Sequence, residues 1–122
     1  MVDTLQSLNL SAFQRYQINM KTFETIKFEI TNGTAIIKIN RPEVYNALNV
    51  QGKLDIISAI KEANKDSTVR SIILAAEGKA FCSGQDLNDR TVDPTKGPVD
   101  IGHTLETEWN PLIQAIKGSD KL

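Results

Sequence analysis

The run VRSIILAA at residues 69–76 constrains the fold most, because it is apolar at nearly every position. Such a short continuous run is typical of a strand that is covered on both faces, as in parallel sheets. Upstream, residues 50–65 have helical spacing and follow Asn49, whose side chain can cap a helix. The apolar stripe predicted for this helix is Leu54, Ile57, Ile60 and Ala63. A strand before the helix would complete a right-handed βαβ unit, so the pattern predicts an α/β fold.

An alternating segment supplies that earlier strand. Residues 26–30 and 35–39 place apolar side chains at every second position, which is the period of a half-buried strand. Asn32-Gly33 separates the two runs, and this pair readily takes the positive φ angles of a tight two-residue turn. The segment therefore predicts a β-hairpin.

The last third of the chain is predicted to contain a loop and a helix. Residues 91–102 hold two prolines and two glycines, which is typical of a loop. A helical stripe follows at Leu105, Trp109, Leu112, Ile113 and Ile116. Because Pro111 lies inside this stripe, the helix is expected to kink or to begin near Asn110.

The chain is predicted to comprise two parts. Residues 1–21 carry only scattered apolar positions and are expected to form an extension that is partly ordered at best. Residues 22–122 are expected to form an α/β unit. A buried parallel strand usually has neighbours on both sides, and too few strands are predicted to supply them. We therefore expect this unit to be part of a larger domain.

Composition excludes several classes of protein. The net charge is −1, with acidic and basic residues mixed along the chain, which argues against a nucleic-acid-binding surface. No apolar run approaches the ~20 residues of a membrane span, and no secretion signal is evident. A single cysteine excludes an internal disulfide and a cysteine-based zinc cluster. The expected compartment is the cytoplasm.

The stretch EGKAFCSGQDLNDR at residues 77–90 follows the buried strand, where α/β folds place their ligand sites. Gly78 and Gly84 allow unusual backbone conformations, and Ala80-Phe81 is expected to plug the loop into the core. The following QDLND can start a helix whose outward N–H groups, near Gln85 and Asp86, would suit an oxyanion. The alternative is a strand-to-helix turn that binds nothing. The pattern lacks the Lys-Ser/Thr of a phosphate-binding loop.

Two motifs carry a resemblance to a known family. INRPEVYNALN at residues 39–49 and SIILAAEGKAFCSGQDL at residues 71–87 resemble the amino-terminal half of the enoyl-CoA hydratase/isomerase (crotonase) superfamily. The resemblance runs from about Phe23 to the end and implies a spiral core of repeated ββα units, expected here in truncated form. The continuation GQDLNDRTVDPTKGPVDIG, followed by WNPLI, resembles the branch that isomerises the ring 1,2-epoxide of phenylacetyl-CoA to an oxepin in phenylacetate breakdown.

The resemblance implies a role for particular positions. The backbone N–H of Gln85 would be one of two donors that stabilise negative charge on the thioester oxygen during enolate formation. The residues expected to line the CoA site are Val44, Ala47, Ser83, Gln85, Asp86 and Leu87. The partner would be an acyl-CoA substrate, with CoA as part of that substrate and no separate cofactor or metal. The resemblance also implies a homotrimer or hexamer of the full-length parent.

The family's second oxyanion donor and its proton-transferring carboxylates lie in a later glycine-rich segment that no position here matches. We therefore expect negligible turnover from this chain alone, and poor stability as an isolated monomer because strand edges would stay unpaired. Two alternatives remain open. One is an enoyl-CoA hydratase of fatty-acid β-oxidation, and the other is a truncated chain that binds CoA or a partner without catalysis.

Other chemically capable residues have simpler explanations. Cys82 is expected to be a small, partly buried apolar residue rather than a nucleophile, and His103 a polar surface or loop residue rather than a base. Trp109 is expected in the core or in the wall of an acyl pocket. Arg41 is expected to fix a turn or to anchor an ion pair. Asp86 and Asp89 could pass for paired acids, but Asp86 is better explained as a cap or a local hydrogen-bond acceptor.

Overall fold

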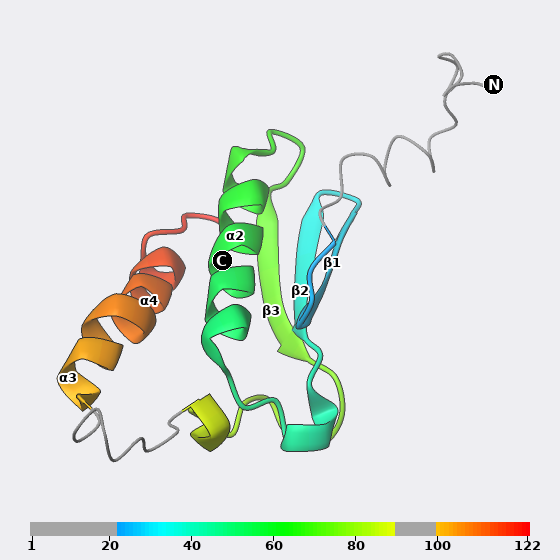
Figure 1. Cartoon of the computed structure of the whole chain (residues 1–122). Coiled ribbons are helices and arrows are strands. Elements are labelled where there is room, and N and C mark those ends of the chain that lie inside the picture. Colours follow the sequence, from blue (N-terminus) through cyan, green and yellow to red (C-terminus); the bar gives the residue numbers. More distant parts are fainter. Residues whose placement is uncertain (1–21, 90–99) are drawn as a thin grey trace.

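The computed structural model describes residues 22–89 and 100–122, in which three strands form one sheet in the order β1-β2-β3 (Figure 1). The strands are β1 (Ile26–Thr31), β2 (Thr34–Ile39) and β3 (Ser71–Ala76), and helix α2 (Val50–Lys65) packs on one face of the sheet. The predicted extension at residues 1–21 and most of the predicted loop at 91–102 lie outside the described residues.

The hairpin is confirmed. Strands β1 and β2 pair antiparallel, with Thr31 opposite Thr34 across a two-residue turn. The turn residues Asn32 and Gly33 have φ angles of 51° and 81°, the positive values that two-residue hairpin turns require. Register places Phe28 opposite Ile37, so the apolar positions of both strands share one face, which packs against α2.

The predicted strand–helix–strand unit is also confirmed. Strands β2 and β3 pair in parallel, and α2 connects them. Asn49 caps the helix, its Oδ1 accepting a hydrogen bond from Gly52 N at 2.7 Å. The predicted apolar stripe is wrong at Leu54, which is exposed. The buried face instead runs through Ile56, Ala59, Ile60 and Ala63, which lie on the side of the helix away from Leu54.

The described residues cover strand β3 on one face only. Ile72 faces α2 and is buried, whereas Ile73 points to the opposite face and is 50% exposed. The prediction of a strand covered on both faces is therefore wrong for the described residues, because α2 covers one face and no other described element covers the second.

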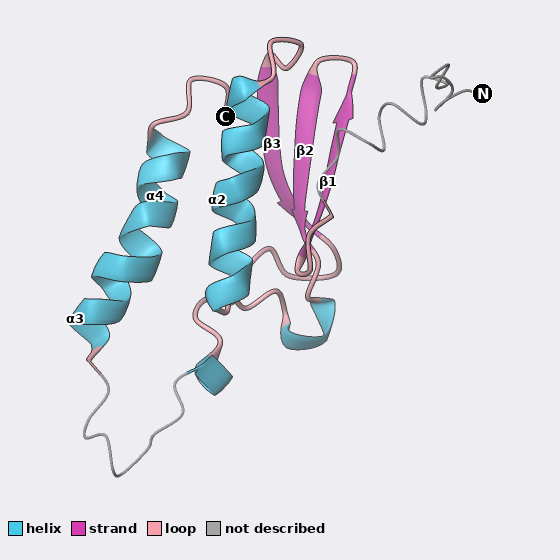
Figure 2. Ribbon diagram, turned by 45° about the horizontal axis from the view of Figure 1, so that its top comes forward, coloured by secondary structure: helices cyan, strands magenta, loops and turns pink. Residues whose placement is uncertain are grey.

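A second helical segment packs against α2 on the side away from the sheet (Figure 2). It runs through α3 (Ile101–Thr104), the π-helical turn η3 (Leu105–Trp109) and α4 (Asn110–Lys117). The helix thus begins within the predicted loop, where the Asp100 side chain accepts from His103 N at 3.0 Å. Pro111 cannot donate a backbone hydrogen bond, and the wider turn η3 lies directly before it. No described helix is long and apolar enough to cross a bilayer.

The carboxyl end of the chain is tied to the core. The Lys121 carbonyl accepts from Ile72 N at 2.8 Å, beside the edge of β3. The Lys121 ammonium donates to the carbonyls of Ala63, Asn64 and Asp66 at distances of 3.0, 2.9 and 3.0 Å. A cation at these unpaired carbonyls stabilises the end of α2.

Candidate functional site

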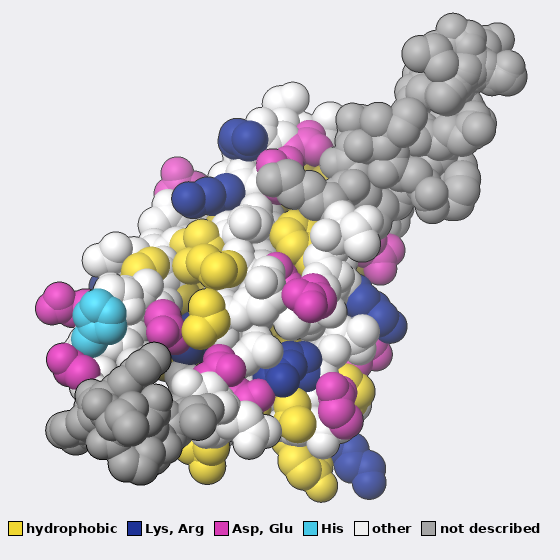
Figure 3. Space-filling model, viewed as in Figure 1, with side chains coloured by type: hydrophobic (Ala, Val, Ile, Leu, Met, Phe, Trp, Pro, Cys, Tyr) yellow, Lys and Arg dark blue, Asp and Glu magenta, His cyan; other side chains and the backbone are white. Residues whose placement is uncertain are grey.

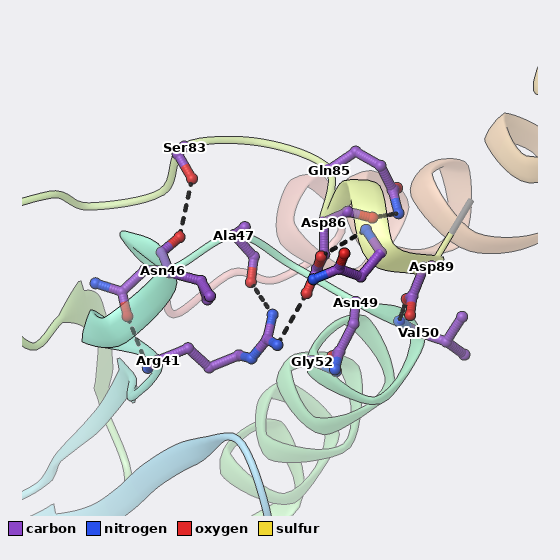
Figure 4. A network of polar contacts seen from close by, with 12 residues as sticks. Arg41, Asn46, Ala47, Asn49, Val50, Gly52, Ser83, Gln85, Asp86 and Asp89 are labelled. Carbon is purple, nitrogen blue, oxygen red and sulfur yellow. Dashed lines mark hydrogen bonds and ion pairs between the residues drawn. The ribbon is translucent and has the colours of Figure 1, made fainter. Parts of the chain in front are cut away.

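Two loops meet at the carboxyl ends of the parallel strands β2 and β3. The first, residues 40–49, contains the 3₁₀ turn η1 (Pro42–Val44), and the second, residues 77–89, contains the 3₁₀ turn η2 (Leu87–Asp89). Backbone hydrogen bonds join them, from Ser83 N to Tyr45 O at 3.2 Å and from Leu48 N to Gly84 O at 2.8 Å. The two motifs that α2 separates in the sequence are therefore adjacent in space (Figure 4).

Asn46 holds the first loop to the second. Its side chain is 0% exposed and its Oδ1 accepts from Arg41 N at 2.8 Å. Its Nδ2 donates to the carbonyls of Glu77 and Ala80 at 2.6 and 2.7 Å. The backbone at Asn46 has a φ of 59°, a left-handed conformation that asparagine tolerates better than most residues. One buried side chain thus fixes both loops through partly buried backbone groups.

Arg41 and Asp86 form a second connection between the loops (Figure 4). The Arg41 Nη2 lies 2.9 Å from Asp86 Oδ2, and Arg41 Nη1 donates to the Ala47 carbonyl. The backbone N–H of Asn88 donates to Asp86 Oδ1 at 2.9 Å. This N–H and then the Arg41 guanidinium hold the pKa of Asp86 below its ordinary value of 3.8. Asp86 is thereby confirmed as a local hydrogen-bond acceptor, and Arg41 as its ion-pair anchor.

The lowered pKa of Asp86 predicts acid-sensitive stability. A carboxyl group whose pKa is lower in the folded state stabilises the fold fully above its unfolded pKa. That stabilisation is lost as pH falls through the folded pKa. We expect the free energy of unfolding to fall between about pH 5 and about pH 2, and to fall less in Asp86→Asn. Urea denaturation at several pH values measures both slopes.

The comparison between variants is needed because the pKa values of Asp66 and Glu77 are lowered as well. The exposed Glu43 on η1 provides the control, and Glu43→Gln should keep the wild-type slope. Equal slopes for wild type and Asp86→Asn would contradict the assignment.

The backbone of Gln85 is held in an unusual way. A parallel bridge pairs Leu48 with Gln85, through hydrogen bonds from Leu48 N to Gly84 O and from Asp86 N to Leu48 O at 2.8 and 2.9 Å. The residue between the two bonded positions turns its own N–H to the opposite side. Among the contacts of the described residues, the N–H of Gln85 has no acceptor. With respect to the described part of the chain, it is therefore a fixed donor that remains available.

Gly84 makes this arrangement possible. Its φ is 113°, which residues with a side chain rarely adopt, and a Cβ placed there would meet no atom within 4 Å. Among the described residues, the space on the Cβ side of Gly84 is therefore open. The N–H of Asp86, which was predicted to point outward, instead donates to Leu48 O. The predicted helix start is a single 3₁₀ turn, so a helix dipole contributes little here.

Exposed apolar side chains surround the loops. Tyr45, Phe81 and Leu87 are 63%, 55% and 75% exposed, and hydrophobic atoms gather at the lower edge of the face in Figure 3. The prediction that Phe81 plugs the loop into the core is therefore wrong. Its neighbour Cys82 packs against the core instead, and this leaves Phe81 directed outward. The loops thus present a polar backbone donor near an apolar surface.

The sequence of this chain matches a known family over most of its length. The profile described as enoyl-CoA hydratase/isomerase matches residues 29–118. The chain belongs to the enoyl-CoA hydratase/isomerase family. Its fold is the crotonase fold, of which the hairpin, α2 and β3 form part.

Three similar proteins illustrate the match. The chain is 37% identical over 93 residues to the 1,2-epoxyphenylacetyl-CoA isomerase of Escherichia coli strain K12, covering 76% of this chain and 36% of that protein. It is 39% identical over 95 residues to a protein named probable enoyl-CoA hydratase from Rhodobacter capsulatus, covering 78% and 35%. A solved enoyl-CoA hydratase from Mycobacterium marinum superimposes with a TM-score of 0.65 at 28% identity, covering 80% and 45%. The chain thus spans about a third of the length of these curated relatives.

The structure brings the predicted site residues together in the two loops. Ser83 Oγ donates to the Val44 carbonyl at 3.3 Å, so these two residues are in contact. Ala47 and Asp86 are buried, whereas Leu87 is exposed. Their contacts to CoA stay predictions.

The other candidate residues have structural partners or lie apart. Asp89 Oδ2 accepts from Val50 N at 2.7 Å, so Asp89 helps to hold the start of α2 rather than pairing with Asp86. Cys82 is a free, partly buried thiol, and His103 is exposed on α3. Within residues 22–89 and 100–122, no three His, Cys, Asp or Glu side chains are grouped so as to hold a metal ion.

Sequence reasoning missed a buried polar network beside the Gln85 side chain. Lys53 on α2 is 1% exposed, and its Nζ lies 2.7 Å from Glu108 Oε1 and 2.7 Å from Gln85 Oε1. Trp109 Nε1 also donates to Gln85 Oε1, at 2.8 Å. The Lys53 ammonium lies 4.6 Å from the centroid of the Trp109 ring. Apolar periodicity gives no signal for such a network, because it assigns charged helix positions to solvent.

Proposed function

We propose that this chain supplies the thioester-binding loops of a CoA-thioester isomerase, with the Gln85 N–H as one of two donors to the thioester oxygen. The observation that carries the proposal is the bridge between Leu48 and Gln85, which fixes this N–H and leaves it without an acceptor among the described residues. Such a preorganised donor is suited to a carbonyl oxygen that becomes negatively charged.

The donor would act when a proton leaves the carbon next to the thioester carbonyl. The resulting enolate carries its negative charge on the carbonyl oxygen, and a fixed N–H stabilises that charge more than it stabilises the neutral carbonyl. Loss of one such donor typically lowers the rate about 10²–10³-fold. A second donor and a proton-transferring group would complete the site, and we assign neither to a described residue.

The proposed reaction is the conversion of 1,2-epoxyphenylacetyl-CoA to oxepin-CoA. Similarity to the Escherichia coli isomerase supports this choice, and the exposed Tyr45, Phe81 and Leu87 offer an apolar surface for an acyl or pantetheine group. CoA would enter as part of the substrate, without a separate cofactor. Enoyl-CoA hydration is the second candidate, supported by similarity to the Rhodobacter capsulatus protein, and it would use the same donor.

Binding of a thioester and of its thioether analogue tests the role of the carbonyl. Phenylacetyl-CoA and the analogue with a methylene group in place of the carbonyl differ only in the atom that the Gln85 N–H would bind. We expect calorimetry to give a dissociation constant about fivefold lower for the thioester, which is the effect of one net hydrogen bond.

Gln85→Pro removes the N–H and should abolish the preference for the thioester over the thioether. Circular dichroism checks that the variant remains folded. Equal affinity of the wild-type chain for the thioester and the thioether would refute the proposal.

A further inference from the structure

The buried lysine on α2 joins three parts of the molecule. Lys53 donates to the Gln85 side chain in the second loop and to Glu108 in η3, and it lies over the Trp109 ring. Its side chain is 1% exposed, whereas Glu108 retains 26% exposure. Lysine is rarely buried, because removing an ammonium group from water is unfavourable even when a carboxylate compensates it.

Stability alone is a weak explanation for this lysine. Well-packed apolar residues often replace a buried ion pair without loss of stability. The second acceptor of Lys53, Gln85 Oε1, indicates a role in positioning instead. This oxygen receives hydrogen bonds from both Lys53 and Trp109. Gln85 Nε2 in turn donates to the Asp86 carbonyl at 3.1 Å. The side chain of Gln85, whose N–H is the proposed donor, is therefore held at both of its polar atoms.

The π-helical turn contributes to this geometry. Glu108 and Trp109 are consecutive residues at the end of η3, and both contact Lys53. A π turn locally changes the direction of side chains along a helix, and such turns are frequent at functional sites. The helical segment 101–117 is thus connected to the second loop through Lys53 and Trp109.

We infer that Lys53 is a positioning residue, which fixes the Gln85 side chain and thereby the direction of the Gln85 N–H toward a thioester oxygen. The inference deepens the proposed function and rests on it for the identity of the ligand. Lys53 does not touch the substrate. It acts through Gln85. Because Lys53 also contacts Glu108 and Trp109, the direction of the Gln85 N–H depends on how the helical segment 101–117 packs.

Lys53→Met tests the inference, because methionine keeps an unbranched side chain and removes the charge. We expect the preference for phenylacetyl-CoA over its thioether analogue to fall about threefold, while the affinity for free CoA stays unchanged. The ¹⁵N order parameter of the Gln85 amide should fall, and that of the core residue Ile37 should not. Lys65→Met is the matched control, since Lys65 lies on the same helix and its side chain is 75% exposed.

Trp109→Phe is a second variant, for use if Lys53→Met does not fold. It keeps an aromatic ring and removes one of the two donors to Gln85 Oε1, so the same changes are expected with smaller size. Unchanged preference and unchanged Gln85 order parameter would overturn the inference, as would equal losses of affinity for thioester, thioether and CoA. If the wild-type chain binds the thioester and the thioether equally, the proposed function is refuted. A lower Gln85 order parameter in Lys53→Met would still support the role of Lys53 in positioning the Gln85 amide.

Discussion

Asn46→Ala is expected to lower the free energy of unfolding by about 3 kcal/mol. The change removes three hydrogen bonds and leaves the Arg41 N–H and the carbonyls of Glu77 and Ala80 without a partner. A buried polar group left unsatisfied costs about 1–3 kcal/mol, and relaxation of the loops keeps the total below a simple sum. Urea denaturation followed by circular dichroism measures the difference.

Asn32→Ala is the matched control for this prediction. Asn32 also has a left-handed backbone, with a φ of 51°, but it is exposed at the hairpin turn. The substitution therefore carries the same backbone penalty without loss of buried hydrogen bonds, and about 1 kcal/mol is expected. Equal destabilisation by the two substitutions would mean that Asn46 contributes only its backbone conformation.

Glu108→Ala is expected to lower the free energy of unfolding by a similar amount, about 3 kcal/mol. Of the described partners of the buried Lys53 ammonium, it leaves the Gln85 side chain and the Trp109 ring. The value lies at the lower end for a broken buried pair because Glu108 itself is partly exposed. Thermal and urea denaturation measure the loss.

Two further variants test whether the loss of stability comes from the Lys53–Glu108 ion pair or from the alanine substitution in η3. Glu106→Ala makes the same substitution at an exposed position of η3 and should change stability little. Lys53→Met combined with Glu108→Ala removes both charges and should recover most of the lost stability. If the double variant is as unstable as the sum of the single variants, Lys53 and Glu108 do not act as a pair.

The strands and the main helix were predictable because their signals are local. Alternation in residues 26–39 and the Asn32-Gly33 turn specify a hairpin without reference to the rest of the chain. Asn49 caps α2 as expected, and the apolar run at 69–76 forms the parallel partner of β2. Because a helix lies between β2 and β3 in the sequence, the two strands were expected to pair in parallel through a crossover connection. The arrangement of these strands could therefore be predicted.

The errors occurred where tertiary contacts decide which side of an element is buried. Leu54 is exposed, whereas Lys53 and Asp55 on the same helix are buried. Asp55 accepts hydrogen bonds from the N–H and hydroxyl of Thr25, at 2.9 and 2.7 Å, so its burial depends on a residue before β1. A pattern based on apolar residues cannot detect a buried face that includes satisfied charges.

The location of the candidate site in the fold could be predicted from the sequence, but its geometry only in part. The resemblance indicated the loops and the Gln85 N–H, and the structure places this N–H without an acceptor among the described residues. Neither the Asn46 hydrogen bonds nor the Lys53 network was expected. The sequence pattern predicts an ordinary loop position for Asn46 and an exposed helix position for Lys53.

Local sequence by itself determined the three strands and α2, since periodicity, capping and turn residues act between neighbours. It also determined that two polar loops follow two parallel strands. Only the tertiary structure decided that the N–H of Gln85 has no acceptor within residues 22–89 and 100–122, while that of Asp86 is bonded to Leu48. The physical reason is that each such contact joins residues separated by α2, so it exists only after the helix has brought the chain back beside β2.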